Sequence, residues 1–495
     1  MNRSAVSPLR IRCLNSESIR PDQKYVLYWM TAYRRLGWNF SLQRAVEHCR
    51  QLKRPLVILE ALRCDYPWAS DRLHSFVLQG MRDNRVAAAK YSGVALHTYV
   101  EPQHGHGKGL VNELARHACV LVTDDFPCFF LPRMVERTAE KLPMCVESVD
   151  SNGLLPMRVA TQEFTTAHSF RRFLHRNLAE SLTQLPESDP LNGLNPLGLS
   201  APALPATVLQ RWPAATEAML TGTVAQLSDL PIDHSVGPGV QQGGTQAARK
   251  RLSEFLHSSL DQYGTERNHP DTDASSRLSG WLHFGHLSAH EVFHRLVARE
   301  SWTPDRLGDA RKCQGSREGW WGMSGAAESF LDELITWREL GFNFCHRRSD
   351  YDQYDSLPEW AQQTLEQHRQ DPRPALYTQE ILAAAETHDP LWNAAQRELM
   401  QTGRMHNYLR MLWGKKILQW TRTPQDALQI MIELNNRFAV DGRNPNSYSG
   451  IFWVLGRYDR AWGPERPVFG KIRYMTSEST QRKLKLTRYL HRFAQ

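Results

Sequence analysis

The chain has 495 residues, of which 41% are hydrophobic and 15 are tryptophans, so it is long enough for two well-filled domains. A mean hydropathy of −0.52, and the lack of an apolar run of about twenty residues, exclude a membrane-spanning helix. The formal net charge of +8 favours a polyanionic partner without identifying it.

The eight cysteines show no C-x-x-C pairing, and the first residues contain no continuous apolar stretch of the kind found in secretory signals. Both features are typical of proteins that keep reduced thiols inside a cell. The sequence therefore predicts a cytoplasmic protein that does not associate with membranes.

The N-terminal part alternates between buried-strand and amphipathic-helix patterns. YVLYWM (25–30) and PLVILEAL (55–62) are short apolar runs separated by a helical stretch. Further strands are expected at 94–102 and 118–127, again with helices between them. Because strand, helix and strand at this spacing form βαβ units, residues 1–165 are predicted to be a parallel, Rossmann-like α/β domain.

Two kinds of site are disfavoured in this domain. It has no G-x-G-x-x-G after its first strand and no Walker sequence, which argues against ordinary dinucleotide or nucleoside triphosphate binding. His104 and His106 share a loop, but two histidines without further ligands are more often solvated than bound to metal. We expect no metal site.

The composition then changes twice. Residues 166–245 are rich in Pro, Gly and Ser, and they are expected to form an interdomain linker. Residues 246–495 show helical patterns throughout, so an all-α C-terminal domain is predicted. Within it, the Gly-rich and charged segment 301–328 carries no recognisable motif.

Three tryptophans gather in the most unusual stretch of the chain, residues 386–460. Trp413 and Trp420 occur at helical spacing in MHNYLRMLWGKKILQW, and Trp392 comes from the preceding segment. Ordinary core packing is the usual explanation for any single tryptophan. Three together can also relay electrons.

Two polar turns interrupt the helical text. LNNRFAVDGRNPNSYSG (434–450) contains turn-forming residues inside an apolar neighbourhood, which suggests a buried ligand, although a solvated turn is the simpler explanation. SSRLS (275–279) precedes a helix, where hydroxyl groups and free N–H groups suit phosphates, although serine is also a routine helix cap.

With THDPLWNAAQ, MHNYLRMLWGKKILQW and LNNRFAVDGRNPNSYSGIFW, the chain resembles class II cyclobutane pyrimidine dimer photolyases of the photolyase and cryptochrome family. The resemblance extends over nearly the whole chain and includes EALRCDYPWASDR (60–72) and VTDDFPCFFLP (122–132) in the N-terminal half. It implies light-driven DNA repair, in which reduced FAD donates an electron that splits the dimer into intact pyrimidines. In some members the N-terminal domain holds an antenna such as 8-hydroxy-5-deazaflavin.

The resemblance also implies which residues serve the flavin. Asn435 matches the position that faces the reactive ring nitrogen, and Arg410 and Asp441 match a charge pair beside the isoalloxazine. Trp392, Trp413 and Trp420 match a relay that photoreduces the flavin. The residues implied in cofactor binding are Tyr263, Ser275, Ser276, Leu278, Ser279, Arg410, Asn435 and Asp441. The chain departs from the family at Gly280-Trp281, where Pro-Tyr is usual.

Substrate residues follow from the same resemblance. Glu333 and Trp337 lie at i,i+4 on a predicted helix over 330–344, where a carboxyl group and an aromatic wall meet the lesion. Two aromatic walls suit a site that holds damaged bases outside the DNA duplex. The full predicted substrate set is Arg267, Asn268, Glu333, Trp337, Met411 and Trp453.

The basic C-terminal stretch interleaves cations with aromatic residues. A solvated tail is one explanation; the other is contact with DNA phosphates, which positions a duplex without reading its sequence. The candidates are Arg460, Lys471, Arg473, Arg482, Lys483 and Lys485. We thus expect UV-damaged DNA as the partner of a monomer that needs no other protein. A cryptochrome-like photoreceptor and a flavin-free DNA-binding scaffold are the rival hypotheses.

Overall fold

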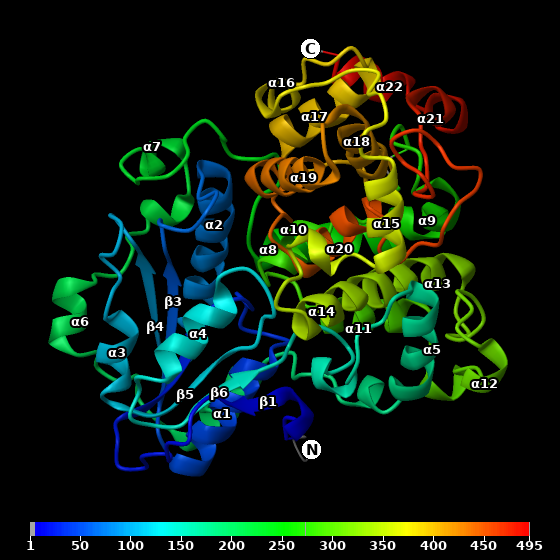
Figure 1. Cartoon of the computed structure of the whole chain (residues 1–495). Coiled ribbons are helices and arrows are strands. Elements are labelled where there is room, and N and C mark those ends of the chain that lie inside the picture. The colour runs from blue at the N-terminus through cyan, green and yellow to red at the C-terminus, as the bar shows by residue number, and fades with distance from the viewer. Residues whose placement is uncertain (1–4, 273, 495) are drawn as a thin grey trace. The chain divides into compact units, whose positions relative to one another are not determined.

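The computed structural model describes residues 5–272 and 274–494, which form two compact units (Figure 1). Unit 1 comprises the residues up to Thr161 together with Asn177–Leu252 and Leu278–Ala298. Unit 2 comprises Gln162–Arg176, Ser253–Arg277 and the residues from Arg299 onwards. Each unit is described by itself below.

Unit 1 is built on a six-stranded sheet with the strand order β1-β6-β5-β2-β3-β4. Every neighbouring pair is parallel except β1 and β6, which are antiparallel. The predicted Rossmann-like α/β architecture is therefore confirmed. The strands are β1 Ile11–Cys13, β2 Tyr25–Met30, β3 Leu56–Leu62, β4 Val94–Val100, β5 Ala118–Asp124 and β6 Val146–Val149.

Helices cover both faces of this sheet. The helices of unit 1 are α1 Phe40–Leu52, α2 Asp71–Ala88, α3 Leu110–Ala115, α4 Leu131–Ala139, α6 Ala206–Arg211, α7 Val224–Leu227, α8 Thr245–Glu254, α10 Ser279–His283 and α11 Ala289–Arg299. On β2, Tyr28 belongs to an apolar cluster with Phe40 of α1, whereas Leu27 belongs to another with Leu114 of α3. Burial on both sides explains why β2 is a continuous apolar run in the sequence.

The segment expected as an interdomain linker, 166–245, is part of unit 1 from Asn177 onwards. Leu220, Leu227 and Leu230 join Val77 and Leu78 of α2 in one apolar cluster. Gly243 lies so close to α2 that a Cβ atom there would come within 1.9 Å of the Phe76 carbonyl oxygen. The Pro and Gly content thus reflects short turns and close approaches. The predicted domain ranges themselves stay a prediction.

Unit 2 is helical, as predicted, and its described residues contain no strand. Its helices are α5 Ala167–Asn177, α9 Leu260–Glu266, α12 Ala310–Cys313, α13 Gly325–Leu331, α14 Arg338–Arg347, α15 Glu359–Gln367, α16 Gln379–Ala384, α17 Pro390–Thr402, α18 Asn407–Trp420, α19 Pro424–Phe438, α20 Pro445–Val454, α21 Ser477–Lys483 and α22 Thr487–Arg492. Among the described residues of the whole chain, no helix has the length and apolar character needed to cross a membrane.

A π-helical turn interrupts the helix that was expected over 330–344. Asp332–Trp337 is π-helical and connects α13 to α14, so the simple i,i+4 geometry expected for Glu333 and Trp337 does not hold. Asp332 at the start of the turn is buried and receives two hydrogen bonds from Arg171 of α5, Nε to Oδ1 at 2.8 Å and Nη2 to Oδ2 at 3.1 Å. The pair anchors the π-helical turn to α5.

We expect Asp332→Asn to lower the free energy of unfolding by about 3 kcal/mol, because removing one partner leaves a buried guanidinium without its counter-charge. Thermal unfolding followed by circular dichroism measures the effect. The exposed carboxylate of Glu318 provides the control, since Glu318→Gln changes the same charge with no buried partner. Equal melting temperatures for Asp332→Asn and the unsubstituted protein would contradict an anchoring role.

Candidate cofactor and substrate site

The three predicted relay tryptophans are in contact inside unit 2. Trp392 of α17 stacks on Trp413 of α18 with ring centroids 6.5 Å apart and ring planes at 3°, and its centroid lies 5.6 Å from that of Trp420. The three side chains are at most 2% exposed, so water does not reach them. The order of contact is Trp413, Trp392, Trp420, with Trp392 in the middle.

Polar groups fix the orientation of these indoles. The Trp392 Nε1–H donates to the Trp413 carbonyl oxygen at 3.0 Å, and the Trp413 Nε1–H donates to Gln396 Oε1 at 2.9 Å. At the other end of the series, Trp420 packs edge-on against the rings of Tyr377 and His388. His388 is exposed, so this end of the series lies near the surface of unit 2.

Three of the predicted flavin residues lie at or beside the polar turn between α19 and α20. Arg410 of α18 pairs with Asp441 of the turn, Nη2 to Oδ1 at 3.1 Å. The Asn435 side chain is buried, and its Nδ2 donates to Ser447 Oγ at 2.7 Å. A Cβ atom on Gly442 would lie 2.8 Å from the Asn435 carbonyl oxygen, so the turn folds tightly against the end of α19.

Ser275 lies beside the partly buried guanidinium of Arg404 and close to the buried His406. Arg404 Nη2 donates to Ser275 Oγ at 3.4 Å, and burial lowers the pKa of Arg404. His406 is also buried; burial, together with the charge of Arg404, lowers its pKa to about 4. The His406 Nδ1 atom has no hydrogen-bond partner among the described residues. The Arg404 guanidinium, with the Ser275 hydroxyl beside it, fits an anionic group such as a diphosphate.

The remaining predicted phosphate residues are placed as follows. Ser276 adjoins Ser275 in unit 2, whereas Leu278 and Ser279 fall in unit 1, where they form the N-terminus of the short helix α10. Leu278 is buried and Ser279 is exposed. Their relation to the Ser275 group is therefore still a prediction.

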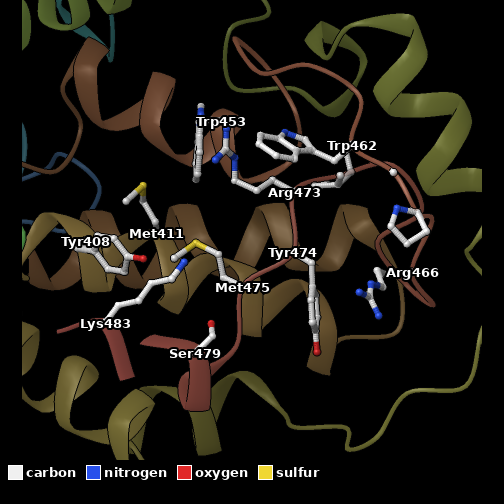
Figure 2. Close-up of a pocket in the computed structure, with 13 residues that line it drawn as sticks. Tyr408, Met411, Trp453, Trp462, Arg466, Arg473, Tyr474, Met475, Ser479 and Lys483 are labelled. Carbon is white, nitrogen blue, oxygen red and sulfur yellow. The ribbon is translucent and has the colours of Figure 1, made fainter. Parts of the chain in front are cut away.

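A cavity of about 470 Å³ in unit 2 contains two of the predicted substrate residues (Figure 2). Met411 of α18 and Trp453 of α20 line it, and Arg473 reaches between the indoles of Trp453 and Trp462, as Figure 2 shows. Its lining residues are Tyr408, Met411, Trp453, Trp462, Gly463, Pro464, Arg466, Ile472, Arg473, Tyr474, Met475, Ser479 and Lys483. Aromatic, sulfur and cationic groups in one cavity suit a flat, polar and anionic ligand.

The other predicted substrate residues are not among those that line this cavity. Glu333 pairs with Arg267, Oε1 to Nη1 at 2.5 Å, and the Arg267 guanidinium lies 5.4 Å from the ring centroid of Tyr263. Burial, followed by the charge of Glu333, raises the pKa of the Tyr263 phenol well above its usual value. Trp337 is partly buried at the end of the π-helical turn, and Asn268 is exposed. The Arg267 guanidinium thus lies between Glu333 and Tyr263, which is one of the predicted flavin residues.

The six basic residues predicted to contact DNA phosphates differ in whether their charges already have partners within the protein. Arg473 makes two hydrogen bonds to Asp459, Lys471 pairs with Glu465, and Lys485 pairs with Glu266. Arg460 lies over the ring of Trp462, with 4.6 Å between its Cζ atom and the ring centroid. Arg482 and Lys483 are exposed at the end of α21, which leaves them best placed for an external phosphate.

Several residues of these sites were missed by sequence reasoning. Arg404 and His406 directly precede α18, and Ser447 orients Asn435, but none of them belongs to a motif that specifies its contact. Trp462 and Tyr474 of the cavity were visible only as aromatic residues within the basic C-terminal stretch. The one available signal was the interleaving of aromatic and basic residues. The described residues contain no group of three or more His, Cys, Asp or Glu side chains able to hold a metal ion.

Comparison of the sequence with known proteins identifies the family of this chain. No family model matches the chain. It is 34% identical to a deoxyribodipyrimidine photo-lyase from Methanothermobacter thermautotrophicus over 98% of this chain and 97% of that relative. Proteins of the same name from Arabidopsis thaliana and Potorous tridactylus are 32% and 31% identical over 98% and 97% of this chain, and over 92% and 83% of their own lengths.

Solved structures show the same fold at much lower sequence identity. A class III photolyase from Agrobacterium tumefaciens superposes with a TM-score of 0.64 at 16% identity, covering 97% of this chain and 87% of that one. A Synechocystis cryptochrome superposes with a TM-score of 0.60 at 15% identity, covering 95% and 88%. Since relatives above 30% identity match almost the whole chain, this protein belongs to the photolyase and cryptochrome family.

Proposed function

We propose that the chain is a class II cyclobutane pyrimidine dimer photolyase, which uses light and reduced FAD to split pyrimidine dimers in DNA. One observation carries the proposal beyond the family likeness. On a single turn of α18, Arg410 pairs with Asp441, Met411 lines the cavity and Trp413 belongs to the tryptophan series. Cofactor, substrate and relay functions therefore meet on neighbouring side chains.

The residues of unit 2 fit FAD. Ser275 and Arg404 would hold the diphosphate, because a hydroxyl group and a guanidinium are donors that suit an anion. The side-chain nitrogen of Asn435 donates to Ser447, and the side-chain oxygen Oδ1 would accept a hydrogen bond from a ring N–H of the flavin. When bound and reduced, FAD supplies the electron that opens the cyclobutane ring. The Arg410–Asp441 pair would tune the electronics of the bound ring.

The lesion would be bound outside the duplex. A dimer is poorly stacked and paired, so its extrusion costs less than that of an intact base, which provides selectivity. Met411 and Trp453 supply the apolar wall of the cavity. Glu333 and Arg267, already paired, offer an acceptor and donors to the dimer. Donors directed at its carbonyl groups stabilise negative charge as it develops there.

Contact with the DNA backbone is assigned chiefly to Arg482 and Lys483. Each phosphate contact that is lost should reduce the dependence of binding on salt, so we expect Arg482→Ala/Lys483→Ala to lower the slope of log K against log salt by about 1.5. Fluorescence anisotropy with a labelled undamaged duplex at several salt concentrations measures this slope. Exposed Arg311 and Lys312 of α12 provide the matched control pair. An unchanged slope would indicate that Arg482 and Lys483 belong to a solvated surface and do not contact DNA.

Light-dependent repair is the direct test of the proposal. Purified protein with chemically reduced flavin is mixed with an oligonucleotide that carries a thymine dimer, and dimer loss is followed under near-ultraviolet light and in the dark. Repair in the light alone supports the proposal. Bound and photoreducible flavin without repair would favour the photoreceptor alternative, and protein without flavin would favour the DNA-binding scaffold.

We further propose that the protein acts as a monomer in the cytoplasm and that unit 1 accepts an antenna such as 8-hydroxy-5-deazaflavin. In support of the antenna, unit 1 contains a cavity of about 510 Å³ beside the end of β4, lined in part by Tyr99, His106 and Arg211. An absorption band additional to that of the flavin in purified protein tests this assignment, and gel filtration tests the oligomeric state.

A further inference from the structure

Lys415 of α18 is a fully buried cation next to the substrate cavity. Its side chain is completely inaccessible to solvent, and its Nζ atom donates to the Val454 carbonyl oxygen at 2.6 Å. The same Nζ atom lies 4.9 Å from the centroid of the Trp453 ring. One ammonium group therefore contacts both the indole of Trp453 and the carbonyl group of the next residue.

A second cation lies over the same indole. The Arg473 Cζ atom is 5.6 Å from the centroid of Trp453 and 4.1 Å from that of Trp462. Asp459 fixes this guanidinium by accepting from its Nε at 2.7 Å and its Nη2 at 3.1 Å. Asp459 also accepts from the Trp462 Nε1–H at 3.1 Å. Trp453 is therefore held by cations from two different segments, α18 and the stretch after α20.

Such an arrangement is costly for a purely structural lysine. Lysine is almost never fully buried unless it is paired, because its charge loses hydration. Lys415 has no ion pair among the described residues; a carbonyl group and an aromatic face are its contacts. A methionine or leucine would fill the same space without this cost. The charge itself therefore needs an explanation, and one of its two contacts, the Trp453 indole, lines the cavity.

We propose that Lys415 is a positioning residue, whose ammonium group fixes the Trp453 indole in the orientation that receives the extruded lesion. The inference rests on the proposed function, in which Trp453 is a wall of the lesion site. Lys415 acts through Trp453, because it is not among the residues that line the cavity. A desolvated cation over an indole is among the stronger cation–π arrangements, which makes it an effective clamp.

The clamp should respond to pH near neutrality. Burial lowers the pKa of Lys415 to about 7; the Asp459 carboxylate opposes this shift, and the Arg473 guanidinium adds to it. Those two are the charged groups that act on Lys415. As pH rises through about 7, Lys415 loses its proton and the cation–π contact with the Trp453 indole weakens. Preferential binding of damaged DNA should therefore fall.

The same pKa has the opposite effect on stability. Between the folded pKa of about 7 and the unfolded value of 10.5, the unfolded chain binds more protons at this position than the folded chain. The free energy of unfolding that is due to Lys415 therefore rises with pH over this window. The fall in preference for damaged DNA that is expected at higher pH therefore cannot be caused by a loss of stability at this position.

The test measures dark binding of a lesion-containing oligonucleotide and of its undamaged counterpart by anisotropy, from about pH 6 to about pH 9. We compare the flavin-loaded protein with Lys415→Met, which removes the charge, and with Lys415→Arg, which keeps it at every pH. Lys312→Met makes the same charge change at an exposed site. We expect Lys415→Met to weaken lesion binding roughly tenfold at low pH with undamaged binding unchanged.

The protein without substitutions should lose its preference for damaged DNA as pH rises. Lys415→Met should show a low preference at every pH. Lys415→Arg should restore a preference that no longer depends on pH. A preference that stays constant with pH in the unsubstituted protein would overturn the inference even if Lys415→Met does not fold. Full lesion affinity in a folded Lys415→Met variant would also overturn it. Failure of the unsubstituted protein to prefer or repair damaged DNA at any pH would contradict the proposed function itself.

Discussion

Replacing Trp392 by phenylalanine is expected to abolish light-driven reduction of the bound flavin, with a fall in rate of about two orders of magnitude or more. Trp392 is the middle indole, which contacts both Trp413 and Trp420, so its loss divides the series into two separate rings. Phenylalanine preserves the apolar burial but is far harder to oxidise. Absorbance of oxidised flavin during illumination with an external reductant measures the rate.

Repair by chemically reduced protein should survive the same substitution, because that assay bypasses the series. Trp413→Phe is expected to behave in the same way. The control is Trp320→Phe, which also replaces a buried tryptophan of unit 2, but one whose ring stacks on His175. If photoreduction in Trp392→Phe proceeded at the rate of the control, the three tryptophans would be ordinary core residues.

The second large effect is expected at Glu333. Glu333→Gln should lower the repair yield about 10- to 100-fold while flavin content stays unchanged, because a charge-assisted hydrogen bond to the lesion is weakened. The substitution keeps the size of the side chain and an oxygen for Arg267. Dimer loss per absorbed photon and the ratio of flavin to protein absorbance are measured on the same sample.

Glu333→Ala is the harsher variant, since it leaves Arg267 unpaired beside Tyr263. We expect it too to retain flavin. Loss of flavin in Glu333→Gln, with normal repair by the remaining holoenzyme, would assign this carboxylate to the cofactor site and not to the lesion. Glu318→Gln again serves as the exposed control.

The parts of the fold that the sequence predicts well are those set by local patterns. β2 is an uninterrupted apolar run, and β3 is one apart from the buried Glu60, because both faces of the sheet are covered; their positions therefore follow from composition alone. The polar turn at Asp441 was predictable because turn residues stand between two helical runs. The spacing of Trp413 and Trp420 likewise placed both on one helix.

The rest depends on contacts between residues far apart in the chain. Nothing near Arg404 indicates that it reaches Ser275, which is 129 positions away. In the sequence, Lys415 is simply one of two adjacent lysines. Only the packing of α20 shows that it is buried and that it contacts Trp453. The sequence predicts a linker over 166–245 because turn residues are frequent there. In the structure, leucines that are separated by these turns pack on α2. Such pairings are set by tertiary structure.

The π-helical turn at Asp332–Trp337 has a consequence for sequence length. A π turn is equivalent to one residue inserted into an α-helix, and each residue of an α-helix advances the side chains by about 100°. Deleting one residue here would turn α14 about its axis relative to α13. Gly341, where a Cβ atom would lie 2.8 Å from the Pro445 carbonyl oxygen, would then no longer face α20. Single-residue deletions should therefore be tolerated less well in this turn than most substitutions.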